Sequence, residues 1–246
     1  MIIGSNIISV DELTSSNTYM SSLLKQQDLR DGTVVTTLFQ TGGRGQSGNK
    51  WESETGKNLL FSILLRPPEI PAEKQFLLSM MISLGICDFA DRFVKPAKIK
   101  WPNDIYVKND KIAGILIENT IMENMTDYSV AGIGFNINQM TFLSDAPNPV
   151  SLKMITGIDY DLEKCLNDVL EDLDRRYKQL LSGDTGQLRN DYTARLYRFR
   201  EWSKYSDITG TFTGRITSVS PEGLLHVEKE PGVSVNYSFK EIDFII

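Results

Sequence analysis

A glycine-dense segment near the start of the chain carries residues that suit an anion. From Gly43 to Trp51 it reads Gly-Arg-Gly-Gln-Ser-Gly-Asn-Lys-Trp. Closely spaced glycines let backbone N–H groups converge on an anion, because glycine tolerates the positive φ angles that such a nest needs. Arg44 and Lys50 add positive charge, and Trp51 offers a flat face on which a base could stack. On these residues alone, a flexible surface loop is the alternative. No helix opens after the segment, so a Rossmann dinucleotide site is not predicted.

A second segment reads Lys100-Trp101-Pro102-Asn103-Asp104. A lysine at the end of a strand is a point charge that suits a phosphate or a carboxylate. Pro102 fixes a turn, and Asn103 and Asp104 can hydrogen-bond the local backbone. The segment alone also fits a β-turn with an exposed lysine.

Two further segments combine strand-forming residues with glycine. Lys111 to Glu118 reads Lys-Ile-Ala-Gly-Ile-Leu-Ile-Glu, with Gly114 at a point of close backbone approach. Gly132 to Asn138 reads Gly-Ile-Gly-Phe-Asn-Ile-Asn, and its alternating glycines strip one strand face of side chains, which leaves a floor for a ligand. The Asn136 amide both donates and accepts, so it could bind an adenine edge. Small residues for core packing are the alternative in both strands.

The elements that position these segments follow from hydrophobic periodicity and turn residues. Capping residues and apolar residues at helical spacing predict helices, and β-branched apolar runs predict strands. The expected helices are 17–29, 73–93, 161–181 and 186–199. The expected strands are 33–40, 59–66, 99–101 with 105–107, 112–118 and 128–135, with loops at 41–58 and 139–148.

The pattern changes after Tyr205 to short alternating segments, at 211–218, 224–228 and 234–239. This predicts a small all-β module that needs support from a neighbour. The earlier part mixes hairpin-linked strands with helices, which favours an α+β architecture with a mixed sheet rather than a doubly wound one. We therefore expect two domains, residues 1–203 and 204–246.

Composition excludes several function classes. The 246 residues carry a formal net charge of -6, which argues against a surface that coats nucleic acid but leaves room for a local basic patch. Cys87 and Cys165 lie far apart and are expected to be buried reduced thiols. His226 is the sole histidine, so neither a metal site nor a histidine-centred triad is predicted. Met1 to Val10 is too short to span a membrane, and we expect a cytoplasmic protein.

The four segments together, in this order, closely resemble the catalytic domain of biotin protein ligases, also called holocarboxylase synthetases. The resemblance covers about Ser9 to Phe199 well, and the tail resembles the small SH3-like C-terminal domain of that family more weakly. It implies a class II synthetase-like mixed sheet flanked by helices, followed by an SH3-like β-barrel. It also implies an enzyme that activates biotin with ATP, in the presence of Mg²⁺, to biotinyl-5'-AMP. The biotin then passes to a lysine of a biotin carboxyl carrier protein.

The resemblance also implies roles for single residues. Lys100 and Arg44 are the expected catalytic residues, because charge builds on phosphoryl oxygens during adenylation. The biotin-binding residues are expected to be Ser15, Ser16, Asn17, Gln40, Gly43, Arg44, Gly45, Lys100 and Gly114. The adenylate-binding residues are expected to be Arg44, Gln46, Asn49, Trp51, Lys100, Asn103, Lys111 and Asn136.

This chain departs from the family pattern at Gln46 and Asn49, where some members carry arginine. Two phosphate partners are therefore neutral here, which bears on how firmly the loop retains the adenylate. Few residues precede the catalytic region, so a DNA-binding helix-turn-helix domain, and with it specific DNA binding, is not expected. Either a monomer or a homodimer fits the resemblance. A lipoate or octanoate transferase, whose pocket must take a linear chain, is the nearest rival, and a non-catalytic nucleotide or biotin sensor is a rival of another class.

Overall fold

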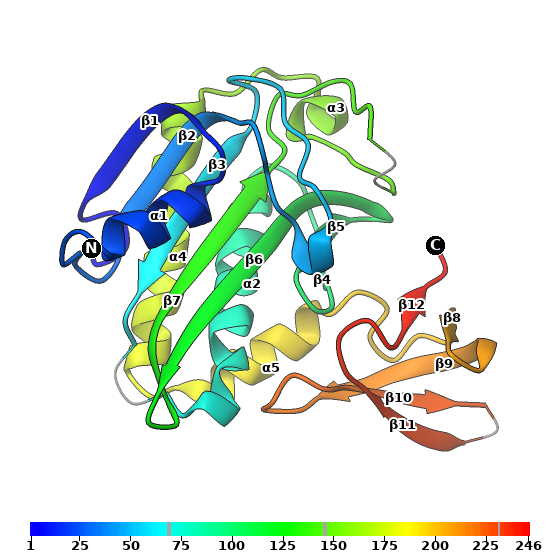
Figure 1. The fold of residues 1–246 in the computed structure, drawn as a ribbon. Coiled ribbons are helices and arrows are strands. Elements are labelled where there is room, and N and C mark those ends of the chain that lie inside the picture. Colours follow the sequence, from blue (N-terminus) through cyan, green and yellow to red (C-terminus); the bar gives the residue numbers. More distant parts are fainter. Residues whose placement is uncertain (68–69, 145–146, 231) are drawn as a thin grey trace.

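The computed structural model of the chain describes residues 1–67, 70–144, 147–230 and 232–246. A seven-stranded mixed sheet forms its centre, in the order β1-β2-β3-β7-β6-β5-β4 (Figure 1). Only β1 and β2 pair in parallel, and the other neighbours are antiparallel. The strands are β1 (Ile7–Leu13), β2 (Val34–Gln40), β3 (Leu59–Leu65), β4 (Ala97–Lys100), β5 (Asp104–Val107), β6 (Asp110–Met122) and β7 (Met125–Phe135).

Two long helices cover one face of this sheet. They are α2 (Phe76–Ala90), which is apolar on nearly all sides, and α4 (Leu162–Leu181), which buries a single apolar stripe. Phe61, Ile133 and Phe135 point from the strands into this layer and join the main hydrophobic core. Burial of these side chains is the main favourable term that holds sheet and helices together.

The opposite face is only partly covered. Helix α1 (Ser16–Leu24) packs through Met20 on Val35 of β2, Leu64 of β3 and Val130 of β7 (Figure 1). Because a strand alternates its side chains between faces, Ser62 and Gly132 point to the same side as Leu64 and Val130. Beyond the end of α1 that side is lined by polar and glycine residues, and the pocket described below lies there.

Most of the expected elements are confirmed, with corrections at their ends. Helix α5 (Thr185–Arg195) ends before Phe199, because Leu196 pairs with Ile99 and the Tyr197 N–H donates to the Ile99 carbonyl at 2.8 Å. Helix α1 ends at Leu24 rather than Leu29. Strand β1 and the short helix α3 (Leu152–Thr156) are not predicted by the sequence pattern. Strand β1 lies at the sheet edge with mostly exposed residues, and its sequence, Ile-Ile-Ser-Val-Asp-Glu-Leu, does not alternate between apolar and polar residues.

The expected β module is a five-stranded antiparallel sheet in the order β11-β10-β9-β8-β12. Its strands are β8 (Ser203–Asp207), β9 (Gly210–Val219), β10 (Leu225–Lys229), β11 (Val233–Tyr237) and β12 (Asp243–Phe244). No pairing joins β11 to β12 within the described residues, so this sheet does not close into a barrel by strand pairing. The division into residues 1–203 and 204–246 stays a prediction.

Aromatic side chains dock this second sheet on the first. The Trp101 indole N–H donates to the Gly223 carbonyl at 2.9 Å. The Phe239 ring lies 5.2 Å from that of Trp101 and 6.2 Å from that of Phe76, measured between centroids. Large buried aromatic surfaces dominate the energetics of such interfaces. Trp101 therefore links the segment that follows β4 to the C-terminal sheet.

Both cysteines are buried and free. Burial raises the pKa of the Cys165 thiol to about 11 and raises the pKa of the Cys87 thiol still further. Thiols of this kind are poor nucleophiles. Among the described residues, no helix is long and apolar enough to cross a membrane.

Helices α2 and α4 approach each other closely at Gly85. A Cβ added there would lie 2.7 Å from Leu173 Cδ2 and 3.0 Å from the Leu173 backbone Cα. We predict that Gly85→Ala lowers the free energy of unfolding by about 1–3 kcal/mol, because the clash outweighs the higher helix propensity of alanine. Gly186→Ala in α5 is the matched control, since nothing lies within 4 Å of its added Cβ. It should raise stability by up to about 1 kcal/mol. Urea unfolding of both variants tests this, and equal stability changes would contradict it.

Candidate functional site

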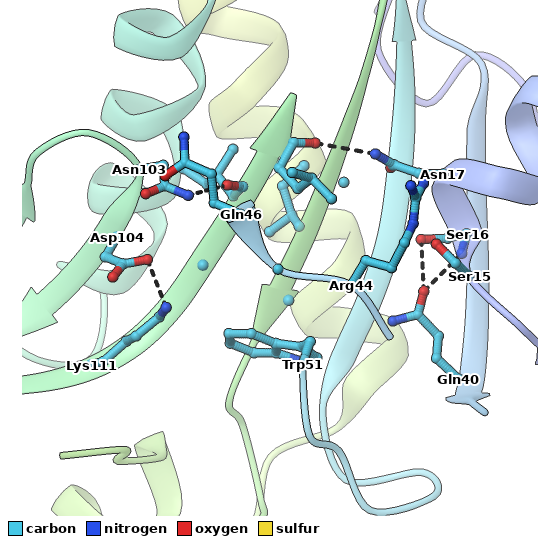
Figure 2. Close-up of a pocket in the computed structure, with 17 residues that line it drawn as sticks. Ser15, Ser16, Asn17, Gln40, Arg44, Gln46, Trp51, Asn103, Asp104 and Lys111 are labelled. Atoms are coloured by element: carbon cyan, nitrogen blue, oxygen red, sulfur yellow. Dashed lines mark hydrogen bonds and ion pairs between the residues drawn. The ribbon is translucent and has the colours of Figure 1, made fainter. Parts of the chain in front are cut away.

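A pocket opens on the uncovered face of the large sheet. Its floor contains Gly114 of β6 and Gly132 and Gly134 of β7, and the loop after β2 covers it. Figure 2 shows Ser16, Asn17 and Gln40 at one end, Asp104 and Lys111 at the other, and Trp51 between them. The alternating glycines of β7 line the pocket, and the prediction that they form a floor for a ligand stays a prediction.

The strand register places the glycines of the floor side by side. Gly114 pairs with Gly134 across β6 and β7, so two neighbouring positions on this face carry no side chain. The Trp51 indole lies in this gap: a Cβ on Gly134 would be 2.3 Å from Trp51 Cε2, and one on Gly114 would be 2.8 Å from Trp51 Cζ3. Any larger residue at either position would displace the indole. The indole nitrogen Nε1 is buried without a hydrogen-bond partner, so it is available to a ligand.

The other end of the pocket is a buried hydrogen-bond network. The backbone N–H of Ser16 donates to Gln40 Oε1 at 2.7 Å, and the Ser16 hydroxyl donates to the same oxygen at 3.2 Å. The Ser62 hydroxyl donates to Asn17 Oδ1 at 2.6 Å and lies 2.7 Å from Ser16 Oγ. Ser15, buried beside them, completes this end. Hydroxyl and amide groups so arranged can bind a small polar ring by both donating and accepting.

A carboxylate joins this network to the covering loop. Glu118 Oε2 accepts from Asn17 Nδ2 at 2.8 Å and pairs with Arg44 Nη2 at 3.1 Å. Both charged side chains keep more than 40% of their surface exposed, so the pair is screened by solvent and contributes little to stability. Arg44 can therefore exchange Glu118 for an incoming anion at small cost.

A second ion pair stands at the opposite end. The Lys111 ammonium lies 2.7 Å from Asp104 Oδ1, and it also lies 5.6 Å from the centroid of the Trp51 ring. Asn103 donates from Nδ2 to the Ile115 carbonyl at 2.6 Å, which fixes the turn between β4 and β5. A cation at this position can neutralise charge on a ligand that extends from the hydrogen-bonded end.

Lys100 lies outside this pocket and lines an adjoining cavity, which Lys111 and Trp51 also line. Its ammonium is 4.9 Å from the centroid of the Phe244 ring and 5.4 Å from that of Tyr106. Burial lowers the pKa of Lys100, and the charge of Asp104 partly offsets that effect. The sequence-based expectation that Lys100 binds both ligands stays a prediction.

The remaining expected residues divide into three groups. Gly45 and Gln46 line the pocket and the adjoining cavity, and Asn49 lines the cavity. Gly43 is buried and lines a neighbouring cavity rather than the pocket, and its carbonyl accepts the Trp51 N–H at 3.0 Å. Asn136 lines none of these cavities, because its amide is buried and donates to the Val150 carbonyl at 3.1 Å. Its Oδ1 is buried without a hydrogen-bond partner, and its assignment to adenine stays a prediction.

Three polar residues of the site were not singled out from the sequence as binding residues: Ser62, Asp104 and Glu118. Ser62 stands in a strand that is otherwise apolar, Leu-Leu-Phe-Ser-Ile-Leu-Leu, and is fully buried. A lone serine in such a strand is a usable signal, because a buried hydroxyl needs a partner. The partners of Asp104 and Glu118 depend on strand pairing, which sequence spacing does not reveal.

The covering loop is fastened to a second loop. The Glu52 carboxylate accepts N–H bonds from Leu143 at 2.7 Å and from Ser144 at 2.8 Å. Burial pushes the pKa of Glu52 upward, but these bonds and one from the Ser144 side chain outweigh it, so the pKa lies below its ordinary value. The ionised carboxylate thus holds the segment beside Trp51 in place.

The pocket therefore combines a polar end, a side-chain-free floor and cations at the far end, which suits a small polar molecule joined to an anionic group. Residues 10–136 match the model of the biotin/lipoate A/B protein ligase family. This span is more than half of the chain. The chain belongs to this family.

Single relatives agree with that result. The chain is 26% identical over 243 residues to the bifunctional ligase/repressor BirA of Bacillus subtilis, which covers 96% of this chain and 74% of the relative. It is 30% identical over 169 residues to the biotin–[acetyl-CoA-carboxylase] ligase of Mycobacterium tuberculosis, covering 67% and 61%. The structure of the Aquifex aeolicus biotin protein ligase with biotin and ATP superposes with a TM-score of 0.79 at 27% identity, over 97% of this chain and 98% of that one.

The contact between Trp51 and the glycine floor predicts how the loop responds to a substitution. Gly134→Ala should expel the indole and loosen the loop, so that trypsin cleaves after Arg44 and Lys50 roughly fivefold faster or more. Gly132→Ala is the matched control, because its Cβ would meet Asn17 Oδ1 at 2.4 Å and not the indole. Timed proteolysis with mass spectrometry measures both rates, and equal acceleration in the two variants would refute the assignment.

Proposed function

We propose that this chain is a biotin protein ligase. It activates biotin with ATP to biotinyl-5'-AMP and pyrophosphate, and it then transfers the biotin to a lysine of a biotin carboxyl carrier protein. The observation that carries the proposal is the pocket itself: a buried polar end formed by Ser16, Asn17 and Gln40 is joined by a glycine floor to the Lys111–Asp104 pair. The Aquifex aeolicus relative, which is described in complex with biotin and ATP, supports the same pair of substrates.

The polar end is proposed to bind the ring system of biotin. A cyclic urea offers two N–H donors and one carbonyl acceptor, and the Ser62 hydroxyl, the Asn17 amide and the Gln40 amide supply matching groups. These groups satisfy one another in the structure, so biotin would replace bonds that already exist. Ser15 and Ser16 complete the proposed ring site, and Gly43, Gly45 and Gly114 border the path of the valeryl chain.

The cations are proposed to act on the reacting phosphate. The biotin carboxylate oxygen attacks the α-phosphorus, the bond from phosphorus to the bridging oxygen breaks, and pyrophosphate leaves with the electron pair. Negative charge on the phosphoryl oxygens is stabilised by cations already in position. Arg44 and Lys100 were expected in this role. We assign the same role to Lys111, because it lines the pocket.

Mg²⁺ is proposed to accompany ATP as the nucleotide's counter-ion. Among the described residues no group of three or more His, Cys, Asp and Glu side chains could hold a metal by itself. That fits Mg²⁺, which commonly binds through substrate phosphates, water and one or two carboxylates. Asp104 and Asp243 line the cavity beside the pocket and would supply those carboxylates. The ion would neutralise charge on the polyphosphate.

Water must be kept from the mixed anhydride once it forms. Trp51 and the backbone of Gly45 and Gln46 lie over the pocket, and the Glu52 bonds to Leu143 and Ser144 hold the loop down. Closure of such a loop protects labile intermediates from hydrolysis. Because Gln46 and Asn49 are neutral, the adenylate is proposed to be held by fewer charges than in relatives with arginine there.

The proposed carrier protein follows from similarity to a relative, and the proposed cellular location follows from the sequence. The Mycobacterium tuberculosis relative is named for acetyl-CoA carboxylase, so a carboxyl carrier domain is the proposed acceptor. The cytoplasmic location, the absence of specific DNA binding and the choice between monomer and homodimer stay predictions.

The test is biotin-dependent exchange of radioactive pyrophosphate into ATP by the full chain, with lipoate as the parallel substrate. We expect exchange with biotin and none with lipoate. Exchange with lipoate alone would identify a lipoate ligase instead. Exchange with neither substrate would favour a non-catalytic binding protein.

Substitution of the lysines tests the roles that we assign. Lys111→Ala and Lys100→Ala should each lower kcat/KM for exchange by about 100-fold or more, because each removes a cation that faces the transferred group. Lys98→Ala is the matched control: it lies two residues from Lys100 on β4, and its ammonium donates to the Ala194 carbonyl, away from the pocket. If Lys100→Ala behaves like Lys98→Ala, Lys100 has no part in adenylation.

A further inference from the structure

A single carboxylate stands behind the polar end of the pocket. Glu118 and Gly114 are an even number of positions apart on β6, so the Glu118 side chain points to the same face as the glycine floor. Within the described part of the chain, Glu118 is the only charged residue that hydrogen-bonds the polar residues of this end, Ser16, Asn17, Gln40 and Ser62. A ligand bound at the polar end therefore lies in the field of one negative charge.

The carboxylate fixes the orientation of the Asn17 amide. Glu118 Oε2 accepts from Asn17 Nδ2 at 2.8 Å, and the Leu116 carbonyl accepts from the same nitrogen at 3.2 Å. A carboxylate and a carbonyl can only accept, so the amide must turn its nitrogen toward them and its Oδ1 away from them. Asn17 Oδ1 lies over Gly132, where an added Cβ would be 2.4 Å from it. Asn17 therefore presents an acceptor above the glycine floor.

The charge of Glu118 strengthens this acceptor. A hydrogen bond to a charged acceptor is stronger than one between neutral groups, and the hydrogen bonds of a chain polarise one another. Asn17 is only 2% exposed, so water does not compete for its amide. Its Oδ1 therefore favours N–H donors of a ligand. A cationic donor gains more than a neutral one, because the field of the carboxylate acts on net charge.

Arg44 balances this carboxylate in the structure, with its Nη2 at 3.1 Å from Glu118 Oε2. In the proposed adenylation Arg44 turns to the reacting phosphate. Glu118 is then left with Asn17 as its remaining side-chain partner. A cation bound at the polar end would replace the charge that Arg44 takes away. The polar end is therefore most favourable to a cationic ring when the phosphate is bound.

We propose that Glu118 is a positioning residue that makes the polar end a site for ring N–H donors, and that it extends the substrates from the cyclic urea of biotin to a cationic cyclic guanidine. This inference rests on the proposed function. A guanidinium offers N–H donors only and keeps its proton at neutral pH. Where the urea has its carbonyl, the guanidinium has a further donor, which Gln40 Oε1 or the Ser62 hydroxyl can accept.

The reaction itself is the same for both ligands, because each carries the same carboxylate at the end of its chain. A carboxylate oxygen bonds to the α-phosphorus, and the bond from phosphorus to the bridging oxygen breaks. Pyrophosphate leaves with the electron pair. The ring forms and breaks no bond, so the identity of the ring changes binding and not the chemistry.

Iminobiotin, in which a cyclic guanidine replaces the urea of biotin, is the probe in the pyrophosphate exchange assay. We expect the parent chain to support exchange with both ligands. Glu118→Gln keeps the side-chain length and an acceptor but removes the charge. It should lower kcat/KM for iminobiotin about tenfold more than kcat/KM for biotin, a moderate effect because the carboxylate is 41% exposed. Glu118→Asp keeps the charge and should retain most of the parent's ratio of the two kcat/KM values.

Asp127→Asn is the matched control. Asp127 is exposed on β7 and lines neither the pocket nor the cavities beside it. Its substitution changes the net charge of the chain by the same amount as Glu118→Gln, and it should leave the ratio unchanged. A looser covering loop, or loss of the ion pair with Arg44, would slow exchange with both ligands alike, so neither would alter the ratio.

The outcomes separate this inference from the proposed function. If the parent chain exchanges with biotin but not with iminobiotin, the extension to a cyclic guanidine is refuted. If Glu118→Gln slows both ligands by the same factor, Glu118 does not act on the ring, and the positioning role is refuted. The proposed function stands in both cases. It would be overturned only if the parent chain showed no exchange with biotin.

Discussion

The site depends on a patch of sheet that has no side chains. Gly114 and Gly134 face each other across β6 and β7, and Gly132 extends the patch toward α1. The other parts of the pocket are positioned by contact with these glycines: the Trp51 indole packs on Gly114 and Gly134, and Asn17 lies over Gly132. A slip of one residue in the register would turn these glycines to the helix-covered face and point the Ile133 side chain into the pocket. The long pairing of β6 with β7 and of β3 with β7 prevents such a slip.

The charged groups that line the pocket are paired with one another or with neighbouring carboxylates. Arg44 is held by Glu118, and Lys111 by Asp104. These pairs keep the cations in position. Each cation can still exchange its carboxylate for another anion, because solvent screens the first pair and the second is partly exposed. An anionic ligand therefore competes with carboxylates instead of recruiting mobile side chains. Preorganised charge of this kind requires little rearrangement when negative charge develops.

Much of the fold could be predicted from the sequence, and the reasons differ between elements. Helix α4 has an apolar stripe at helical spacing, and the strands that surround the glycines are rich in isoleucine, so both were expected. Strand β1 was missed because its apolar and polar residues do not alternate, as is tolerated in an edge strand that buries little. The end of α5 was misplaced because Leu196 pairs with Ile99, a contact between residues far apart in sequence.

The residues of the candidate site could be predicted where they belong to one contiguous motif. They were harder to predict where their position depends on the pairing of strands. The polar residues at the start of α1 and the loop from Gly43 to Trp51 were expected, and most of them line the pocket. Lys100 and Lys111 were both expected near the nucleotide, but only the β4–β5–β6 pairing shows that Lys111 lies in the pocket and Lys100 in the adjoining cavity. The role of Trp101 as an anchor for the C-terminal sheet required the tertiary structure, because its partner, Gly223, lies far along the chain.

The two buried thiols have a practical consequence for following the covering loop in solution. Cys87 and Cys165 are the only cysteines of the chain, and burial makes both poor nucleophiles. A maleimide dye will therefore leave the folded protein unlabelled. A single cysteine introduced in the loop in place of the exposed Thr55 would then be the one labelled position, without removal of a native residue from the core. The protein is in this respect ready for fluorescence measurements of loop opening and closing.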